Sequence, residues 1–147
     1  MLEHLSRRVD HVIKLANQIA REYEQEYVGT EHVLLAIIQE GTGLGAHILL
    51  DHEATEVRIE AQIKKLMKAS MEDTWVFGRL PGTPHFKNVI AHAIEEAREL
   101  KSKVVCTEHL LLGLLAEKGS VAHAALKALG ITPKMVRDDI VRTAAQA

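Results

Sequence analysis

The chain has 147 residues, of which 47% are hydrophobic, and it carries a formal net charge of −2. This length allows one domain with its own core. The small net charge and the lack of a block of lysines and arginines exclude a basic surface that could bind a row of phosphates, so we expect no nucleic acid partner. Residues 1–8 show no apolar signal region and no apolar stretch has the length of a membrane span, so we expect a soluble, cytoplasmic protein without a membrane partner. The one cysteine cannot form an internal disulfide.

The first segments read as helices because apolar residues recur at steps of three and four. Ser6 is predicted to cap a helix whose apolar stripe covers residues 9–23. Thr30 is predicted to cap a second, strongly apolar helix, and a short third helix is expected after the glycines at 41–43. A fourth helix is predicted to begin at Thr55, with a buried stripe formed by Val57, Ile59, Ile63, Leu66 and Met67.

Residues 70–82 are predicted to link two halves of the chain. The segment contains turn formers, but it also contains the large apolar side chains Trp75 and Phe77. A solvated tether does not normally carry such side chains, so we expect the linker to pack against one half. Trp75 and Phe77 are therefore also candidates for contact with a partner.

The second half repeats the first at an offset of 77 residues. Thr30-Glu31-His32 returns as Thr107-Glu108-His109, each followed by an apolar run, and 14 of the 41 positions from Val9 to Leu49 are identical to their counterparts. Thr83 matches Ser6 as a cap, and Thr107 matches Thr30. We expect an all-α fold of eight helices, as two pseudo-symmetric four-helix repeats that stack into a single domain, 1–147: repeat one 1–69, linker 70–82 and repeat two 83–147.

The fourth helices of the two repeats are predicted to differ. That of repeat two is expected to begin at Thr132-Pro133 and to bury a stripe of Met135, Val136, Ile140 and Val141. Aligning Val57 with Val136 needs a two-residue gap, because repeat one lacks the helix-stopping glycine that Gly130 supplies in repeat two.

The order of these motifs resembles the Clp N-terminal repeat, also called the Clp repeat domain. The matching stretches are Ser6 to Arg21, Val28-Gly29-Thr30-Glu31-His32-Val33-Leu34-Leu35 with Glu40-Gly41, Thr83-Pro84 to Arg98, and Val105-Cys106-Thr107-Glu108-His109-Leu110-Leu111-Leu112. The resemblance implies a compact eight-helix domain that receives substrates and adaptor proteins for AAA+ unfoldases of the ClpA/ClpC class. The chain itself contains no P-loop motif, so it is either part of a longer unfoldase or a free-standing repeat protein.

The resemblance also implies phosphoarginine binding, since the corresponding glutamates of the ClpC branch take part in it. Transferred by motif, one site comprises Glu31, Ser6 and Arg8, and the other comprises Glu108 and Thr83. A carboxylate would pair with the guanidinium while a helix N-terminus takes the phosphate. The alternative is that both glutamates only stabilise their helix dipoles, by about 0.3–1 kcal/mol each.

Catalytic chemistry is not predicted for the repeated histidines. No serine or cysteine nucleophile recurs beside His32 and His109, so both are expected to be packed, hydrogen-bonded structural residues. Cys106 takes the place of Gly29 and is expected to fill a tight turn, although its position near a helix start can lower a thiol pKa. Histidines seven residues apart do not recur between the repeats, so no metal site and no cofactor are predicted; the pairs are His4/His11 and His85/His92.

The leading hypothesis is a non-enzymatic protein-recognition module that binds substrate polypeptides or adaptors for a Clp unfoldase. The alternative is a free-standing regulator or competitor of such an unfoldase, and an enzyme would require a convergent polar pocket that the repeats do not indicate. The candidate ligand- and partner-binding residues are Glu31, Glu108, Ser6, Arg8, Thr83, Trp75 and Phe77.

Overall fold

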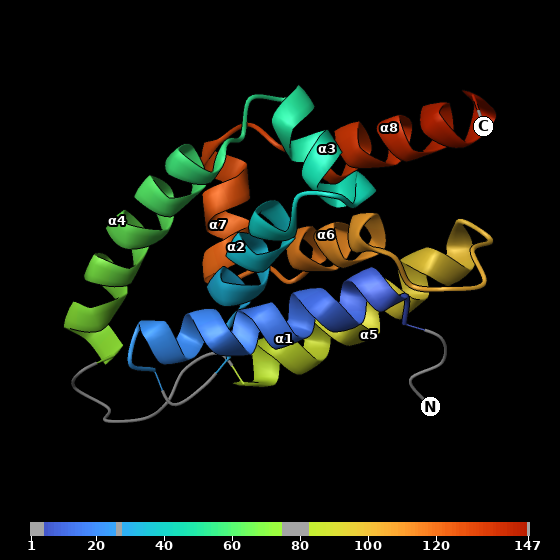
Figure 1. Ribbon diagram of the computed structural model, residues 1–147. Coiled ribbons are helices and arrows are strands. Elements are labelled where there is room, and N and C mark those ends of the chain that lie inside the picture. The colour runs from blue at the N-terminus through green and yellow to red at the C-terminus, as the bar shows by residue number, and fades with distance from the viewer. Residues whose placement is uncertain (1–4, 26–27, 75–82, 147) are drawn as a thin grey trace.

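The structure is a computed structural model that describes residues 5–25, 28–74 and 83–146. Those residues form eight helices and one isolated parallel β-bridge between Leu5 and Val105 (Figure 1). The predicted all-α fold is confirmed. The helices are α1 (Arg7–Glu22), α2 (Thr30–Glu40), α3 (Leu44–Asp51), α4 (Glu56–Thr74), α5 (Thr83–Glu99), α6 (Thr107–Ala116), α7 (Val121–Ala128) and α8 (Pro133–Gln146).

The core is built around α2 and α6, the second helices of the two repeats. Both lie at the centre of the molecule, and their apolar residues are buried from 33 to 38 and from 110 to 115 (Figure 1). Helix α1 packs on α2, and α5 packs on α6 in the same way. The other helices surround α2 and α6, which therefore bury residues on every side. A surface helix would instead bury only one apolar stripe.

Contacts between the repeats come in reciprocal pairs among the described helices. Helix α3 of repeat one packs on α6, and α7 of repeat two packs on α2. Helix α4 likewise packs on α7 while α8 packs on α3, and α1 contacts α6 while α5 contacts α2. The two repeats are therefore pseudo-symmetric and share one core. No single described helix is both long and apolar enough to span a membrane; the bent pair α2 and α3 meets that test only when taken together.

The predicted cap at Ser6 is confirmed, and the fourth helices begin after Thr55 and Thr132, as predicted, with these threonines as caps. The side-chain oxygen of Ser6 accepts a hydrogen bond from the Val9 N–H at 3.1 Å, and Thr132 Oγ1 accepts one from the Met135 N–H at 3.2 Å. Thr55 caps α4 in the same manner, at 3.4 Å. Helix α4 continues to Thr74, into the segment expected as a linker, whereas Trp75 and Phe77 lie outside the described residues.

The caps predicted at Thr30 and Thr107 are wrong. Gly29 and Cys106 are the N-cap residues of α2 and α6, and each threonine hydroxyl bonds to the other repeat instead. Thr107 Oγ1 accepts from the Gly45 N–H at 2.9 Å in the first turn of α3, and Thr30 Oγ1 accepts from the Ala122 N–H at 3.2 Å in the first turn of α7. Each repeat thus uses its threonine to satisfy a helix start in its twin.

The repeated histidines complete the starts of α2 and α6. His32 Nδ1 accepts a hydrogen bond from the Gly29 N–H at 2.8 Å, and His109 Nδ1 accepts one from the Cys106 N–H at 2.9 Å. Both side chains are buried, as expected for structural histidines. Burial lowers the pKa of His32 to about 4 and also lowers that of His109, although the charge of Glu96 opposes the shift at His109.

The gap predicted between the fourth helices is also wrong, because repeat one stops α3 without a glycine. Glu53 takes a positive φ of 61° at the position where Gly130 has 80°. The next residues make the same bond: the Ala54 N–H donates to the Leu49 carbonyl at 2.8 Å, and its counterpart in repeat two spans 3.0 Å. The offset of 77 residues therefore continues through this turn.

The continuous offset changes which residues of the fourth helices face the core. Ile59 and Val136 are buried counterparts, as are Ile63 and Ile140. Val57, which the sequence pattern placed in the buried stripe, is 79% exposed, and Val141 is exposed by 57%. Both positions fall just outside the apolar face that the correct alignment defines.

Candidate functional site

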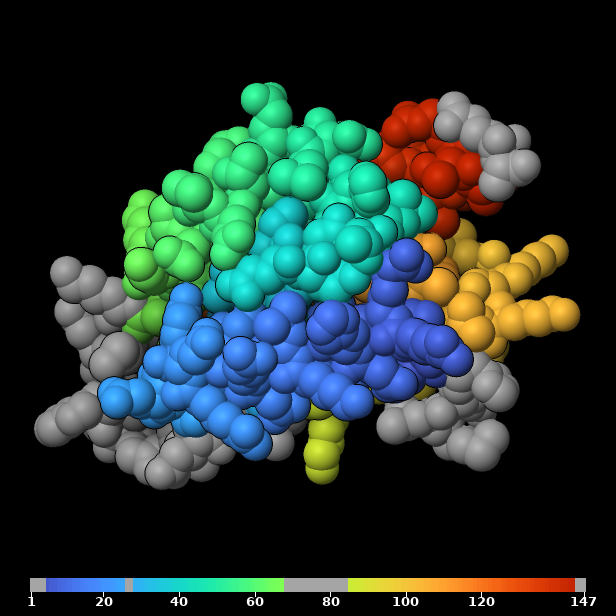
Figure 2. Space-filling model, viewed as in Figure 1, coloured from blue at the N-terminus to red at the C-terminus, as the bar shows by residue number. Residues whose placement is uncertain are grey.

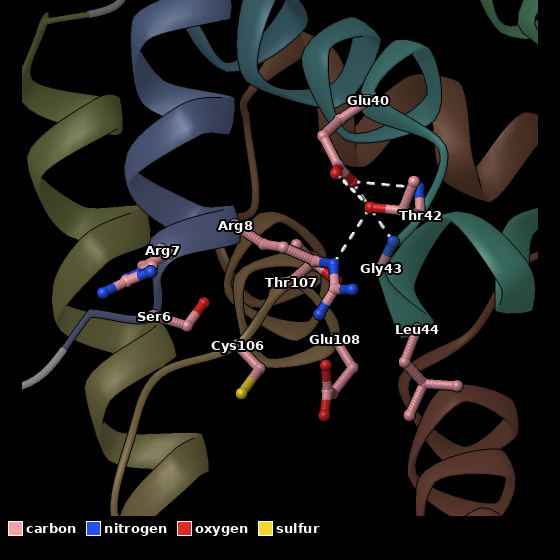
Figure 3. A pocket seen from close by; sticks show the side chains of 10 residues that line it. All are labelled: Ser6, Arg7, Arg8, Glu40, Thr42, Gly43, Leu44, Cys106, Thr107 and Glu108. Carbon is pink, nitrogen blue, oxygen red and sulfur yellow. Dashed lines mark hydrogen bonds between the residues drawn. The ribbon is translucent and has the colours of Figure 1, made fainter.

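A pocket of about 530 Å³ lies where the first turns of α1, α3 and α6 meet (Figure 3). In the space-filling view the start of α1, the segment joining α2 to α3, and the region of α6 come together on one side of the molecule (Figure 2). Both repeats contribute to its wall. The lining residues are Ser6, Arg7, Arg8, Glu40, Thr42, Gly43, Leu44, Cys106, Thr107 and Glu108.

Backbone pairing holds the start of α1 beside the start of α6. The Ser6 N–H donates to the Val105 carbonyl at 2.9 Å, next to the bridge between Leu5 and Val105. Because Cys106 directly follows Val105, this pairing puts Ser6 and Cys106 on the same wall of the pocket (Figure 3). A residue that caps the first helix of repeat one therefore faces a residue that caps the second helix of repeat two.

The opposite wall is held by a network around Glu40. Arg8 Nε donates to Thr42 Oγ1 at 2.9 Å, and the Thr42 hydroxyl donates in turn to the Glu40 carboxylate (Figure 3). The backbone N–H groups of Thr42 and Gly43 also donate to Glu40 Oε1, each at 3.1 Å. Burial raises the pKa of Glu40, but these hydrogen bonds and the charge of Arg8 outweigh it and lower the pKa overall. Glu40 is thus an ionised structural carboxylate.

Glu108 is the second carboxylate of the pocket and has a different environment. It is half-buried in the first turn of α6, and burial raises its pKa, although a hydrogen bond from its own backbone and the charge of Arg8 oppose the shift. Figure 3 shows its side chain in the pocket near Arg8 and Leu44. A cationic ligand would relieve this desolvation, so Glu108 is the acidic group that a bound guanidinium would stabilise.

Cys106 lines the pocket as well as capping α6. The helix start does not lower its pKa: burial raises the pKa of the Cys106 thiol, and the negative charge of Glu108 raises it further. A hydrogen bond with Ser6 and the charge of Arg8 act in the opposite direction. The thiol is therefore less readily ionised than an exposed cysteine.

The structure brings together predicted site residues that belong to different repeats. Ser6 and Arg8 lie together with Glu108, the glutamate of the other repeat. Glu31 is not among the residues that line this pocket; it is buried at the start of α2, beside Thr30, which bonds to the start of α7. Thr83 begins α5, but its side chain lies outside the described part of the chain, as do Trp75 and Phe77.

The counterpart of Glu40 in repeat two, Glu117, belongs to a polar cluster that the sequence pattern did not reveal. Three side chains on one face of α5 reach its buried carboxylate: His85 Nδ1 at 2.6 Å, Asn88 Nδ2 at 2.9 Å and His92 Nε2 at 3.2 Å. Burial raises the pKa of Glu117, but the hydrogen bonds from these side chains lower it overall. The offset of 77 residues from Glu40 was the signal that could have identified it.

Comparison with known proteins gives a consistent result over nearly the whole chain. The pattern of the Clp repeat (R) N-terminal domain matches residues 4–78 and again residues 81–147. The chaperone protein ClpC2 of Oryza sativa subsp. japonica, a chloroplastic protein, is 35% identical over 142 residues, and a ClpA homolog of Cyanidium caldarium is 37% identical over the same length. These alignments cover 97% of this chain but only 15% and 16% of the relatives.

Solved structures show the same fold. The N-terminal domain of the chaperone ClpD from Arabidopsis thaliana superposes with a TM-score of 0.71 at 19% sequence identity, covering 97% of this chain and 99% of that one. A structure described as part of a malarial protein secretion system gives a TM-score of 0.69 at 19% identity, covering 95% and 93% of the two chains.

Proposed function

The chain belongs to the Clp repeat (R) N-terminal domain family, and on that premise we propose that it is a non-enzymatic recognition module that binds substrate polypeptides or adaptor proteins for a Clp-type unfoldase. Its relatives include ClpC and ClpA chaperones, and the chain spans about 15% of their length. The unfolding activity of those proteins is not assigned to this segment, which contains no P-loop motif. Recognition is the role proposed for it.

The observation that carries the proposal is the pocket between the repeats. Three helix N-termini, those of α1, α3 and α6, meet there, and each presents the positive end of a helix dipole. Arg7 and Arg8 add positive charge, whereas Glu108 supplies a desolvated carboxylate on the same pocket. A site with both signs of charge suits a ligand that joins an anionic group to a cationic one.

Phosphoarginine on a marked substrate is the narrower ligand class that this charge pattern supports. Glu108 would take the guanidinium, and Arg8 with the helix starts would take the phosphate. The site proposed here differs from a site within one repeat, because Ser6 and Arg8 come from repeat one and Glu108 from repeat two. Glu31 and Thr83 stay predictions for a second site, and Trp75 and Phe77 stay predictions for partner contact.

We retain three further parts of the hypothesis as proposals. The chain is divided into repeat one at 1–69, a linker at 70–82 and repeat two at 83–147, within a single domain. Its location is the cytoplasm, although the plant relatives are chloroplastic by name. The alternative function is a free-standing regulator that competes for the partners of an unfoldase, and excess purified chain would then inhibit degradation by the complete protease.

Calorimetric titration with free phosphoarginine tests the ligand class. We expect binding by the wild-type chain and a loss of affinity of about 10- to 100-fold in Glu108→Gln, because one charge-assisted interaction is removed. Arg8→Ala is expected to weaken binding by a similar factor. Arginine and inorganic phosphate are titrated separately, since each supplies only one of the two charges.

The controls separate this site from general charge effects. Glu95→Gln changes an exposed carboxylate of α5 and should leave the affinity unchanged. Glu31→Gln reports whether the sister glutamate contributes a second site. Equal affinity in wild type and Glu108→Gln, or no binding by either, would remove phosphoarginine as the ligand without affecting the broader proposal.

The broader proposal is tested by photo-crosslinking from the pocket. A photoreactive amino acid at Leu44, which lines the pocket, should capture Clp components, adaptors or unfolded client proteins from native lysate, to be identified by mass spectrometry. The same probe at Val57, which is 79% exposed on α4, is the matched control. Identical protein sets from both positions would contradict recognition through this pocket.

A further inference from the structure

The first turn of α6 brings together three different metal-binding groups. The Cys106 sulfur, a Glu108 carboxylate oxygen and a His109 ring nitrogen all lie within 4.8 Å of one another. The three residues fall within four consecutive positions, so the helix start itself sets their spacing. Glu108 is shared with the phosphoarginine site proposed above, whereas Cys106 and His109 have no role in that proposal.

Two of the three groups are accessible from the pocket. Cys106 and Glu108 line it, and Figure 3 shows their side chains on the same side of the α6 start. His109 does not line the pocket and is 2% exposed, and its Nδ1 accepts a hydrogen bond from the Cys106 N–H at 2.9 Å. A metal bound at Nδ1 would therefore replace the amide as the partner of that nitrogen.

We propose that Cys106, Glu108 and His109 form a site for Zn²⁺ or a similar divalent transition metal. Thiolate sulfur, imidazole nitrogen and carboxylate oxygen are the ligands that Zn²⁺ takes in proteins, at about 2.0–2.3 Å. The donor atoms, which lie within 4.8 Å of one another, have to move closer together before one ion can bind all three at these metal–ligand distances. Three protein ligands leave a fourth position facing the pocket, where water or a donor from a bound partner completes the tetrahedron.

The mixture of donors selects the class of metal. A thiolate and an imidazole favour Zn²⁺ and related transition metals over Mg²⁺ and Ca²⁺, which prefer oxygen ligands. Burial and the charge of Glu108 disfavour the Cys106 thiolate, and a divalent cation bound between the two groups would offset both effects. Arg8 also acts on both groups and reduces the net negative charge that the metal meets.

The two repeats provide an internal comparison. Repeat one has Gly29, Glu31 and His32 at the corresponding positions, so it keeps the carboxylate and the imidazole but lacks the thiol. The site is therefore proposed for repeat two alone. Cys106→Gly installs the residue that the sister helix start already uses, with the same backbone conformation at the cap.

Titration of the reduced, chelator-treated chain with Co²⁺ tests the site directly. We expect one equivalent of Co²⁺ to produce the near-ultraviolet charge-transfer band of a Co²⁺–thiolate bond, together with the strong visible bands of a tetrahedral centre. Competition with Zn²⁺ should remove both signals. Cys106→Gly should lose the charge-transfer band, and Glu108→Gln should bind Zn²⁺ at least tenfold more weakly.

Glu31→Gln is the matched control and should leave both metal signals unchanged, because it alters the repeat without the thiol. Circular dichroism of each variant verifies that the helical content of the chain is unchanged. Absence of a thiolate band in the wild-type chain would overturn the proposal. Zn²⁺ affinity that is equal in wild type and Cys106→Gly would do so as well, since the metal would then be held by other groups such as the half-exposed His85 and His92.

Discussion

The side-chain oxygen of Thr107 lies 2.9 Å from the backbone nitrogen of Gly45, and this bond joins the first turn of α6 to the first turn of α3 across the two repeats. Thr107→Val keeps the shape of the side chain but leaves the buried Gly45 N–H without its acceptor. We expect the free energy of unfolding to fall by about 1–3 kcal/mol, measured by urea denaturation. Thr143→Val, at an exposed position of α8, should change it by no more than about 0.5 kcal/mol.

Gly113 allows α6 to approach α5 closely. Its substitution by alanine tests whether the stability of the protein rises or falls. Helix propensity alone predicts that Gly113→Ala stabilises the protein by about 1 kcal/mol. A Cβ at this position would lie 2.5 Å from the Val89 carbonyl oxygen, a backbone atom that cannot move aside alone. We therefore expect destabilisation by about 1–3 kcal/mol in urea denaturation. A stabilised variant would show that the two helices are farther apart.

His32 should make the protein less stable in mild acid. Its pKa is about 4 in the folded state and 6.5 in the unfolded state, so the unfolded chain binds more protons between these values. Stability attributable to His32 is complete above pH 6.5 and is lost as the pH falls towards 4. At pH 5 the loss relative to pH 7 should be about 2 kcal/mol, measured by urea denaturation at both values.

Two variants separate the contribution of His32 to this pH dependence from that of other groups. His32→Gln keeps a side-chain acceptor at the third helical position and should show a smaller loss between pH 7 and pH 5. His47→Gln removes an exposed histidine and should behave like wild type. If His32→Gln and wild type lose equal stability, His32 is not buried in its neutral form.

The ion pair between Glu96 and Arg137 should be replaceable by apolar residues. Arg137 bonds to both carboxylate oxygens of Glu96, through Nε at 3.1 Å and Nη2 at 2.7 Å, and Glu96 is buried. Arg137→Met leaves that carboxylate unpaired, so we expect a loss of about 1–2 kcal/mol, reduced by the partial exposure of the arginine.

The double variant Glu96→Ile/Arg137→Met should recover most of that loss, because repeat one carries the buried Ile19 at the position of Glu96. Thermal and urea unfolding of the single and double variants complete the cycle. A double variant less stable than Arg137→Met would indicate that the ion pair contributes more than its apolar counterpart.

Much of the fold could be predicted from the sequence because local signals and the repeat agree. Ser6, Thr55 and Thr132 cap the helices that the apolar spacing predicted, and the buried histidines occupy equivalent positions. The stop of α3 could not be predicted, since Glu53 adopts the left-handed conformation that usually belongs to glycine. That single residue explains why the predicted alignment of the fourth helices was wrong.

The composition of the candidate site was harder to predict for a different reason. An internal repeat identifies which residues are equivalent, but it does not say which copies face each other in space. The family resemblance grouped Ser6 and Arg8 with Glu31, whereas in the structure they line a pocket together with Glu108. The hydrogen bonds of the Thr30 and Thr107 hydroxyls to the other repeat could not be predicted for the same reason. The unpaired N–H groups of a helix start can donate to any acceptor that packs against them, including one from the other repeat.

The reciprocal bonds of Thr30 and Thr107 have the form of a subunit interface with two-fold symmetry, in which the contact from one copy to the other is always returned. Two separate half-length chains could form the same contacts among these helices, but only at concentrations high enough to associate. Joining them in one polypeptide makes that association independent of concentration. It also allows Cys106 to appear in one half without its copy in the other, which identical subunits could never achieve.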